Sequence, residues 1–173
     1  MTIRPIITAP DPRLKLRSEV IAEVDDGVRQ LLDDMYETMV AAPGIGLAAV
    51  QIGEPRAAIA VCLDTPEGEE PRPYYLVNPE VVWRSDEEMQ HEEGCLSLPE
   101  QFAEVVRPAE ARIRYLDYRG EEQELHAAGL LARCILHEMD HLRGVLFVDH
   151  LTVIKRNMIL RKLAKARRQQ ASA

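Results

Sequence analysis

The segment HEMDH, residues 137–141, constrains this chain more than any other feature, because it sets two histidines four residues apart inside a predicted helix. That helix runs from Gly129 to about Arg143 and is ended by Gly144. Residues i and i+4 share one helix face about 6 Å apart, so both imidazoles can reach one metal ion. Glu138 stands beside them and can handle a proton. Two ligands alone do not make a metal site, so a chance occurrence of the motif stays open until a third ligand is found.

The third ligand distinguishes this chain from the metallopeptidases that carry the same motif. Those enzymes complete the site from downstream, either with a histidine at the position that is Phe147 here or with a glutamate, and no glutamate follows the motif. Only Asp149 and His150 remain on that side. Upstream, Cys95 lies in the segment 91–99, which we predict to be irregular, and it is the natural candidate. One thiolate with two imidazoles leaves a fourth position for water, which is typical of a catalytic metal site.

The remaining cysteines and histidines carry weaker signals. Three cysteines are an odd number and too few for a disulfide framework in 173 residues, so we expect reduced thiols. Cys62 is expected to be a small buried side chain. Cys134 shares the helix face of the motif histidines, so it should line the site without binding the metal. No spacing supports a ligand role for the other histidines, which we expect at the surface or in hydrogen bonds: His91, His126 and His150.

The segment GIGLAAVQ, residues 44–51, is the third feature that carries chemistry. Its glycines do not fit a phosphate-binding loop, which would end in Lys-Ser or Lys-Thr. They suit the close approach of the backbone to an extended ligand. Gln51 is polar in an apolar stretch, and it is either a hydrogen-bonded core amide or a donor to an oxyanion. The sequence pattern leaves both interpretations open.

Apolar spacing and turn residues predict an α+β domain in which short, mostly antiparallel strands pack around the central metal-binding helix. A capped amphipathic helix follows Asp25 and ends near Pro43, and a final helix begins near Thr152. The predicted strands are 57–63, 74–77, 81–83, 111–118 and 123–127, the last two forming a hairpin. A turn-rich connection is expected at 64–73 and an acidic loop at 85–93.

The charge of the chain is unevenly distributed. The length of 173 residues predicts one domain, with a catalytic part at 1–150 and an appended basic helix at 151–173. The net charge is −8, but residues 152–173 hold seven Lys or Arg and no acid, so they carry +7 and the remainder carries −15. The acidic remainder disfavours general or sequence-specific nucleic-acid binding. For the basic tail, a solvated helix face and a contact site for RNA both remain open.

No segment is expected to enter or cross a membrane. The longest uncharged apolar run, 57–63, is far shorter than the roughly 20 residues that a membrane-spanning helix requires. The N-terminal segment MTIRPIITAPD lacks an apolar signal core. We therefore expect the chain to stay in the compartment where it is made, the cytoplasm.

With these three segments identified, the chain resembles the peptide deformylases of bacteria. The segments GIGLAAVQ (44–51), EGCLS (93–97) and HEMDH (137–141) are similar to the three motifs of that family and stand in its order. The spacings between them are similar to those of the bacterial enzymes, and the flanking segments GLLARC, DHLRGVLF and PDPRL are family-like as well. The resemblance therefore covers nearly the whole domain.

The resemblance implies removal of the N-formyl group from the initiator methionine of new polypeptides, with formate as the second product. It implies that the metal, usually Fe(II) in this family with Zn, Ni or Co as possible substitutes, is held by Cys95, His137 and His141. On this basis we hypothesise that a metal-activated hydroxide attacks the formyl carbonyl, with Glu138 as general acid and base. The oxyanion donors would be the Gln51 side chain and the Leu96 backbone N–H.

The resemblance also implies the substrate contacts and a partner. Ile45, Gly46 and Gly94 would meet the substrate backbone, while Glu93, Leu130, Arg133 and Cys134 would form the wall of the methionine pocket. In similar bacterial enzymes a basic C-terminal helix contacts the ribosome near the peptide exit, which raises that option for residues 151–173.

Three residues depart from the family pattern near this pocket: Arg133, His91 and Phe102. None of them is a metal ligand or Glu138, so side-chain preference is affected rather than turnover. The Arg133 stem is expected along the pocket with its charge in solvent.

Three other functional classes compete with this interpretation: a metallopeptidase, an inactive relative that only binds ribosomes, and an RNA-binding module formed by the tail. The missing downstream ligand disfavours the first, and the intact set of site residues disfavours the second. The tail has no aromatic residue after Phe147, which disfavours the third.

Overall fold

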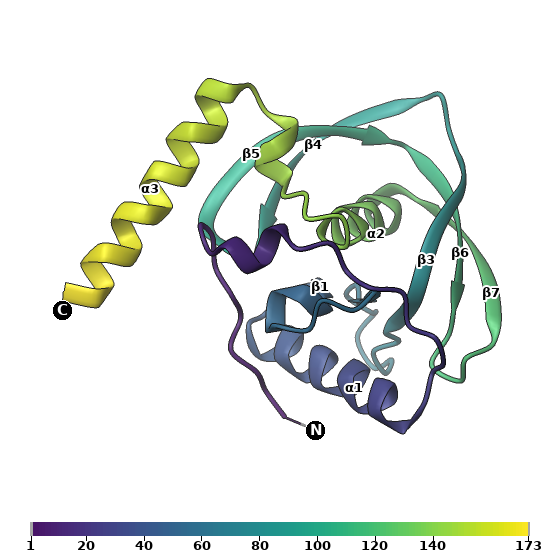
Figure 1. Cartoon of the computed structure of the whole chain (residues 1–173). Coiled ribbons are helices and arrows are strands. Elements are labelled where there is room, and N and C mark those ends of the chain that lie inside the picture. The colour runs from purple at the N-terminus through teal and green to yellow at the C-terminus, as the bar shows by residue number, and fades with distance from the viewer. Residues whose placement is uncertain (1, 173) are drawn as a thin grey trace.

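A computed structural model describes residues 2–172, and it has the predicted α+β architecture (Figure 1). In chain order its elements are η1 (Pro12–Lys15), α1 (Asp26–Ala41), β1 (Gly46–Ala48), η2 (Ala49–Ile52), β2 (Ala58–Val61), β3 (Tyr74–Arg84), β4 (Glu88–Cys95), β5 (Leu98–Pro108), β6 (Glu110–Leu116), β7 (Glu122–Ala128), α2 (Gly129–His141), η3 (Phe147–His150) and α3 (Val153–Ser172). The strands form one sheet in the order β1-β2-β3-β6-β7 and a separate pair, β4-β5, and every strand pairing among them is antiparallel.

The predicted helices begin and end close to their expected positions. The Asp25 carboxylate accepts a hydrogen bond from the Val28 N–H at 2.9 Å, which caps α1. Helix α2 starts at Gly129 as expected, and a turn ending at Gly144 follows it. The Thr152 hydroxyl accepts from the Lys155 N–H at 3.3 Å and so caps α3, as its sequence position indicates. The hairpin of β6 and β7 around Gly120 is also confirmed.

Two strands lie where the sequence analysis predicted a loop and an irregular segment, and that prediction was wrong. The segment 85–93 contributes most of β4, and Cys95 is the last residue of that strand rather than part of an irregular segment. Its partner β5 was not predicted at all. Five of the eight residues of β4 are exposed and three are glutamates, so no apolar alternation marks the strand. Pairing with β5 holds it in place, with Gly94 opposite Phe102.

Two smaller differences concern β1 and β3. Residues 46–48, for which no strand was predicted, form the edge strand β1 beside β2. The two short strands expected around Asn78 are one strand, β3, whose register shifts between Val77 and Glu80. Asn78 takes up a positive φ of 51° there, and its side-chain amide exchanges two hydrogen bonds of 2.8 Å with the Ile21 backbone. This amide holds the irregular part of β3 in place.

Helix α2 lies in the middle of the molecule, between the five-stranded sheet and the β4-β5 pair (Figure 1). Its apolar residues, such as Ala132 and Ile135, are buried against the larger sheet. The polar residues His137, Glu138 and His141 are buried as well. Polar side chains at such positions need partners, so α2 brings a polar cluster into the interior of the fold.

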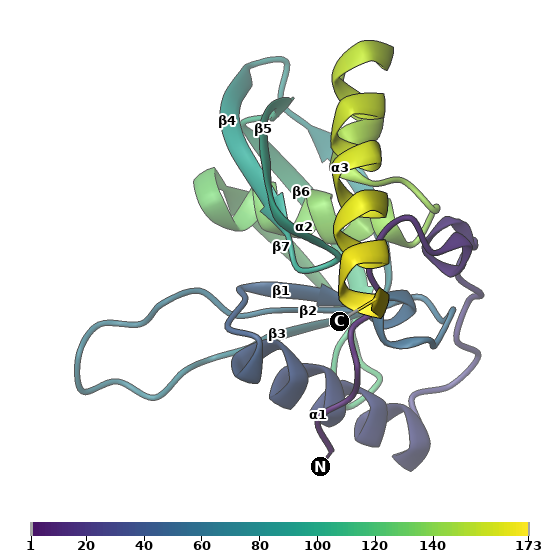
Figure 2. The same cartoon turned by 90° about the vertical axis from the view of Figure 1, so that its left-hand side faces the viewer.

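Helix α3 lies along the outer side of the β4-β5 pair, and the connection between β2 and β3 extends away from the body on the opposite side (Figure 2). Leu163 is the buried residue of α3, and it joins the core cluster that also contains Phe147. Among residues 2–172, no helix is long and apolar enough to cross a membrane.

Candidate metal centre

Three predicted ligands converge at the centre of the fold. The ligand atoms of Cys95, His137 and His141 all lie within 4.8 Å of one another. The Cys95 Sγ atom lies 3.4 Å from His141 Nε2. The thiol comes from the end of β4 and the two imidazoles from one face of α2. The structure therefore brings together the residues that sequence spacing and the family resemblance selected.

His137 is oriented by a carboxylate on its other side. Its Nδ1 lies 2.8 Å from Glu93 Oε1, and both side chains are buried. An ionised Glu93 accepts a hydrogen bond from the Nδ1–H group, which leaves Nε2 unprotonated and available to a metal ion. The resemblance implies that Glu93 forms part of the methionine-pocket wall. The structure adds that its carboxylate orients the imidazole ring of His137, one of the predicted metal ligands.

Glu93 is held in turn by Arg107, which the sequence analysis did not identify. The Arg107 guanidinium donates to both Glu93 oxygens, at 2.6 and 2.9 Å, and to Asp140 Oδ2 at 3.0 Å. Burial opposes ionisation of Glu93, but the hydrogen bonds from His137 and Arg107 outweigh it and lower the Glu93 pKa to about 2. Glu93 is therefore ionised at neutral pH and can fix the His137 ring.

Asp140 completes this buried network. It accepts hydrogen bonds from His150 Nε2 at 2.8 Å and from Arg143, as well as from Arg107. Although burial opposes ionisation, these partners lower the pKa of Asp140. In strand β5 the charged Arg107 directly follows the apolar Val106. This charged residue within a strand is the one sequence signal that could have revealed the network.

Glu138 lies in an enclosed position beside the three ligands. It is 5% exposed, and its Oε2 atom has no hydrogen-bond partner within residues 2–172. Burial raises the Glu138 pKa to about 7, and the positive charge of Arg107 partly opposes that rise. A Cβ atom at Gly46 would collide with the Glu138 carboxyl, so only glycine allows β1 to approach so closely. A carboxyl group with this pKa can both accept and donate a proton near neutral pH.

Gln51 is hydrogen-bonded through both ends of its side-chain amide. Its Oε1 accepts from the Ala48 N–H at 2.8 Å, and its Nε2 donates to Ser97 Oγ at 2.9 Å. The same Nε2 lies 3.5 Å from Cys95 Sγ. Gln51 is thus a hydrogen-bonded core amide, and its NH₂ group also faces the metal centre.

The remaining expected site residues surround this centre. Leu96 follows β4, and its side chain packs so closely against Gly44 that a Cβ atom there would collide with it. Gly94 is covered in the same way by the exposed ring of Phe102. Ile45 and Leu130 are 40% and 43% exposed, which leaves apolar side chains open to a ligand.

Arg133 and Cys134 lie one turn before His137 on α2. Arg133 is half-buried and has no hydrogen bond or ion pair within the part of the chain that the structure describes. Burial raises the pKa of the Cys134 thiol to about 12, which fits a neutral side chain that lines the site without binding metal.

Of the histidines without a predicted ligand role, His126 pairs with Glu110 at 2.8 Å at the surface and His150 bonds to Asp140.

The residues present fit a single transition-metal ion. One sulfur and two nitrogen atoms suit Fe(II), Zn, Ni or Co. Each of the three ligands comes from a fixed element, and Glu93 directs the His137 ring toward the other two. Three protein ligands would leave a fourth position of a bound ion to water or substrate, as in a catalytic rather than a structural site.

The α+β fold with an HExxH helix and an upstream cysteine defines a hydrolase of the single-metal class. The polypeptide deformylase family model matches residues 3–157. A peptide deformylase of Phenylobacterium zucineum is 55% identical over 165 residues, which cover 95% of this chain and 97% of that protein. The chain belongs to the polypeptide deformylase family.

Solved structures agree with this assignment. A peptide deformylase from Ehrlichia chaffeensis is similar with a TM-score of 0.92 and 42% identity, covering 98% of this chain and 99% of that one. One from Legionella pneumophila has a TM-score of 0.90 and 40% identity, covering 99% of each chain. A third, also from Ehrlichia chaffeensis, is a complex with actinonin, at a TM-score of 0.91 and 43% identity over 96% of this chain and 98% of that one.

Proposed function

We propose that this chain hydrolyses the N-formyl group of formylmethionine at the N-terminus of newly made polypeptides and releases formate. Membership of the polypeptide deformylase family supports this activity. The observation that carries it in the structure is the convergence of Cys95, His137 and His141 beside the buried Glu138. A metallopeptidase is the nearest alternative, and the absence of a downstream third ligand disfavours it.

We assign each group of site residues a separate role in hydrolysis. Cys95, His137 and His141 would hold a metal ion, which would act as a Lewis acid and lower the pKa of a bound water molecule; Fe(II) is the ion we propose, from the family. Glu138 takes the proton of the attacking water and delivers it to the departing amine. The Gln51 amide and the Leu96 backbone N–H donate hydrogen bonds to the carbonyl oxygen as it becomes negative.

Substrate contacts follow from the exposed residues around the centre. Ile45, Gly46 and Gly94 lie on the two segments that flank the metal ligands and would pair with the substrate backbone. The methionine side chain would lie against the face of α2 one turn before His137, in a pocket formed by Glu93, Leu130, Arg133 and Cys134.

A direct assay tests the proposed function. Protein prepared without oxygen and loaded with Fe(II) should release one formate per formyl-Met-Ala-Ser peptide and leave the internal peptide bonds intact. Treatment with a chelator should abolish formate release, and adding back the metal should restore it. The matched acetyl-Met-Ala-Ser peptide controls for the formyl group. Cleavage of an internal bond, or no formate from the loaded protein, would reject the assignment.

We also propose that α3 is appended to a catalytic part at 1–150 and attaches the enzyme to ribosomal RNA near the peptide exit. Five of its cations are exposed and have no ion pair within residues 2–172: Lys155, Arg161, Lys162, Lys165 and Arg168. Two others are already paired, Arg156 with Asp149 and Arg167 with Asp11. Exposed, unpaired cations provide electrostatic attraction to a phosphate backbone.

Removing charge from α3 should weaken ribosome binding without affecting hydrolysis. Deleting the helix would also remove Leu163 from the core, so the double substitution Lys165→Gln and Arg168→Gln is the cleaner test. It should reduce cosedimentation with ribosomes, most strongly at low salt, make the remaining binding less dependent on salt, and leave formyl-peptide hydrolysis unchanged. Arg72→Gln with Arg119→Gln removes two exposed charges from loops of the body as a control. Equal cosedimentation of all three proteins would refute the role of α3.

A further inference from the structure

The short 3₁₀ turn η3 lies downstream of α2, where metallopeptidases that carry the same helix motif supply their third ligand. Within residues 2–172 the ligand group is Cys95, His137 and His141, so η3 contributes no ligand here. Two of its residues nevertheless reach toward the metal centre, Phe147 and His150. The function proposed above gives neither of them a role.

Phe147 lies against the ring of the ligand His137. The two ring centroids are 6.3 Å apart and the ring planes are inclined by 28°. Aromatic rings attract each other at this separation. Phe147 is 1% exposed and belongs to a core cluster that also contains its neighbours Leu146 and Val148. Its ring is therefore held by the core, and it limits tilting of the His137 ring on that side.

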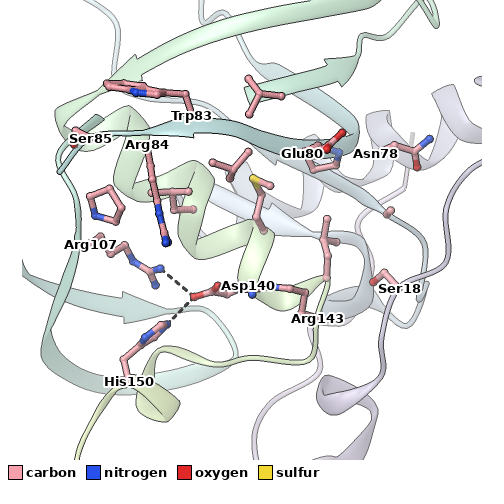
Figure 3. A pocket seen from close by; sticks show the side chains of 18 of the residues that line it. Ser18, Asn78, Glu80, Trp83, Arg84, Ser85, Arg107, Asp140, Arg143 and His150 are labelled. Atoms are coloured by element: carbon pink, nitrogen blue, oxygen red, sulfur yellow. Dashed lines mark hydrogen bonds and ion pairs between the residues drawn. The ribbon is translucent and has the colours of Figure 1, made fainter. Parts of the chain in front are cut away.

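The second contact of η3 is polar. His150 Nε2 lies 2.8 Å from Asp140 Oδ2, as the dashed line in Figure 3 shows. Asp140 is 4% exposed and also accepts hydrogen bonds from the guanidinium groups of Arg107 and Arg143. A carboxylate between two guanidinium groups is ionised and can only accept, so His150 donates through Nε2. Because His150 and Arg107 share Oδ2, His150 fixes the atom to which Arg107 is bound.

Arg107 carries this constraint from Asp140 to the metal ligand. Its Nη1 donates to Asp140 at 3.0 Å, and its Nε and Nη2 donate to Glu93 at 2.6 and 2.9 Å. Glu93 Oε1 in turn lies 2.8 Å from His137 Nδ1. A guanidinium is a rigid planar fork, so a shift at its Asp140 end also moves the donors that hold Glu93. These side chains are all buried, so water does not readily replace a contact that is lost.

The turn that carries both residues is itself fixed. The Asp149 carboxylate accepts from the Leu146 N–H at 2.9 Å and from the Lys15 ammonium at 2.7 Å. It also pairs with Arg156 at 3.2 Å. Lys15 ends η1 and Arg156 lies in α3, so η3 is attached to elements on both sides. The turn can therefore present its two contact residues in a single arrangement.

We infer that η3 positions the metal ligand His137, with Phe147 and His150 as positioning residues. Phe147 acts on the imidazole ring directly, and His150 acts on it through the buried network of Asp140, Arg107 and Glu93. The inference rests on the metal site proposed above, and it concerns how firmly that site holds its ion. Loss of a group that orients a metal-binding histidine typically weakens metal affinity by about 10- to 100-fold.

Titration of the metal-free full chain with Co(II) tests the role of His150, because the visible absorption of bound Co(II) depends on the arrangement of its ligands. His150→Leu should weaken Co(II) binding by about tenfold and change that absorption. His150→Gln keeps an N–H donor for Asp140 and should retain most of the affinity. The matched control is His126→Leu, which removes an exposed histidine that lies 2.8 Å from Glu110 on the sheet. This control should bind Co(II) like the unmodified chain.

Phe147→Leu tests the second contact, because it removes the ring beside His137 but keeps an apolar side chain in the core. It should weaken Co(II) binding and change the absorption of bound Co(II) at temperatures where circular dichroism shows the chain to be fully folded. A loss of core packing alone would lower the melting temperature and leave the absorption of bound Co(II) as it is.

The outcomes separate this inference from the proposed metal site. Unchanged Co(II) affinity and absorption in His150→Leu, or an equal loss in His150→Gln, would overturn the role of His150. Unchanged Co(II) absorption in folded Phe147→Leu would do the same for Phe147. If the unmodified chain binds no Co(II), the proposed metal site itself is contradicted.

Discussion

Replacing Glu138 with glutamine is expected to abolish formyl-peptide hydrolysis while the protein keeps its metal. The expected loss is about 100- to 10,000-fold in kcat, the usual contribution of a positioned acid or base. Glu138 is buried beside the three ligands, and burial raises its pKa to about 7, where proton exchange with substrate and water is efficient. Glutamine keeps the volume that packs against Gly46 but cannot take up a proton. Elemental analysis and steady-state kinetics measure the two expected outcomes.

The control for this substitution is Glu92→Gln. Glu92 is an exposed carboxylate on β4, and the change in net charge is the same. This variant should keep its full activity and metal content. If Glu138→Gln loses its metal instead, then Glu138 stabilises the site rather than moving a proton. If it keeps both metal and activity, another group handles the proton.

The metal centre could be predicted from the sequence because most of its information is local. His137 and His141 share a helix face through their spacing alone, and the helix that carries them starts at Gly129, where the sequence predicts its start. The choice of Cys95 needed elimination of downstream ligands together with the family resemblance. Its location at the end of a strand was not predicted, because β4 depends on pairing with β5 rather than on an apolar pattern of its own.

The hydrogen-bond network that orients His137, formed by Glu93, Arg107 and Asp140, could not be predicted in the same way. Arg107 and Glu93 are 14 residues apart, and Arg107 and Asp140 are 33 apart, so only the folded chain brings them together. A sequence pattern shows that Arg107 is charged, but not which acids it meets.

Substitution of Gln51 is the second change for which we expect a large effect. Gln51→Ala should lower kcat by about 100- to 1000-fold, the loss that follows removal of one donor to a developing oxyanion. The side chain is fixed by Ala48 and Ser97, so its NH₂ group is held toward Cys95 before substrate arrives. A donor that is already oriented stabilises the transition state without reorganisation. Kinetics with a formyl-Met peptide and a metal assay measure the result.

A purely structural role for Gln51 predicts a different pattern. Gln51→Ala also leaves the Ala48 N–H without its partner, so a loss of stability alone would lower activity through unfolding. Gln51→Glu separates the two roles, because it keeps the size of the side chain and an oxygen for Ala48 but replaces the NH₂ donor. If the donor matters, this variant should remain folded, with a melting temperature close to that of the unmodified chain, and still lose kcat. Near-normal turnover in folded Gln51→Glu would show that Gln51 only holds η2 against Ser97, and the oxyanion would then depend on the Leu96 N–H and the metal.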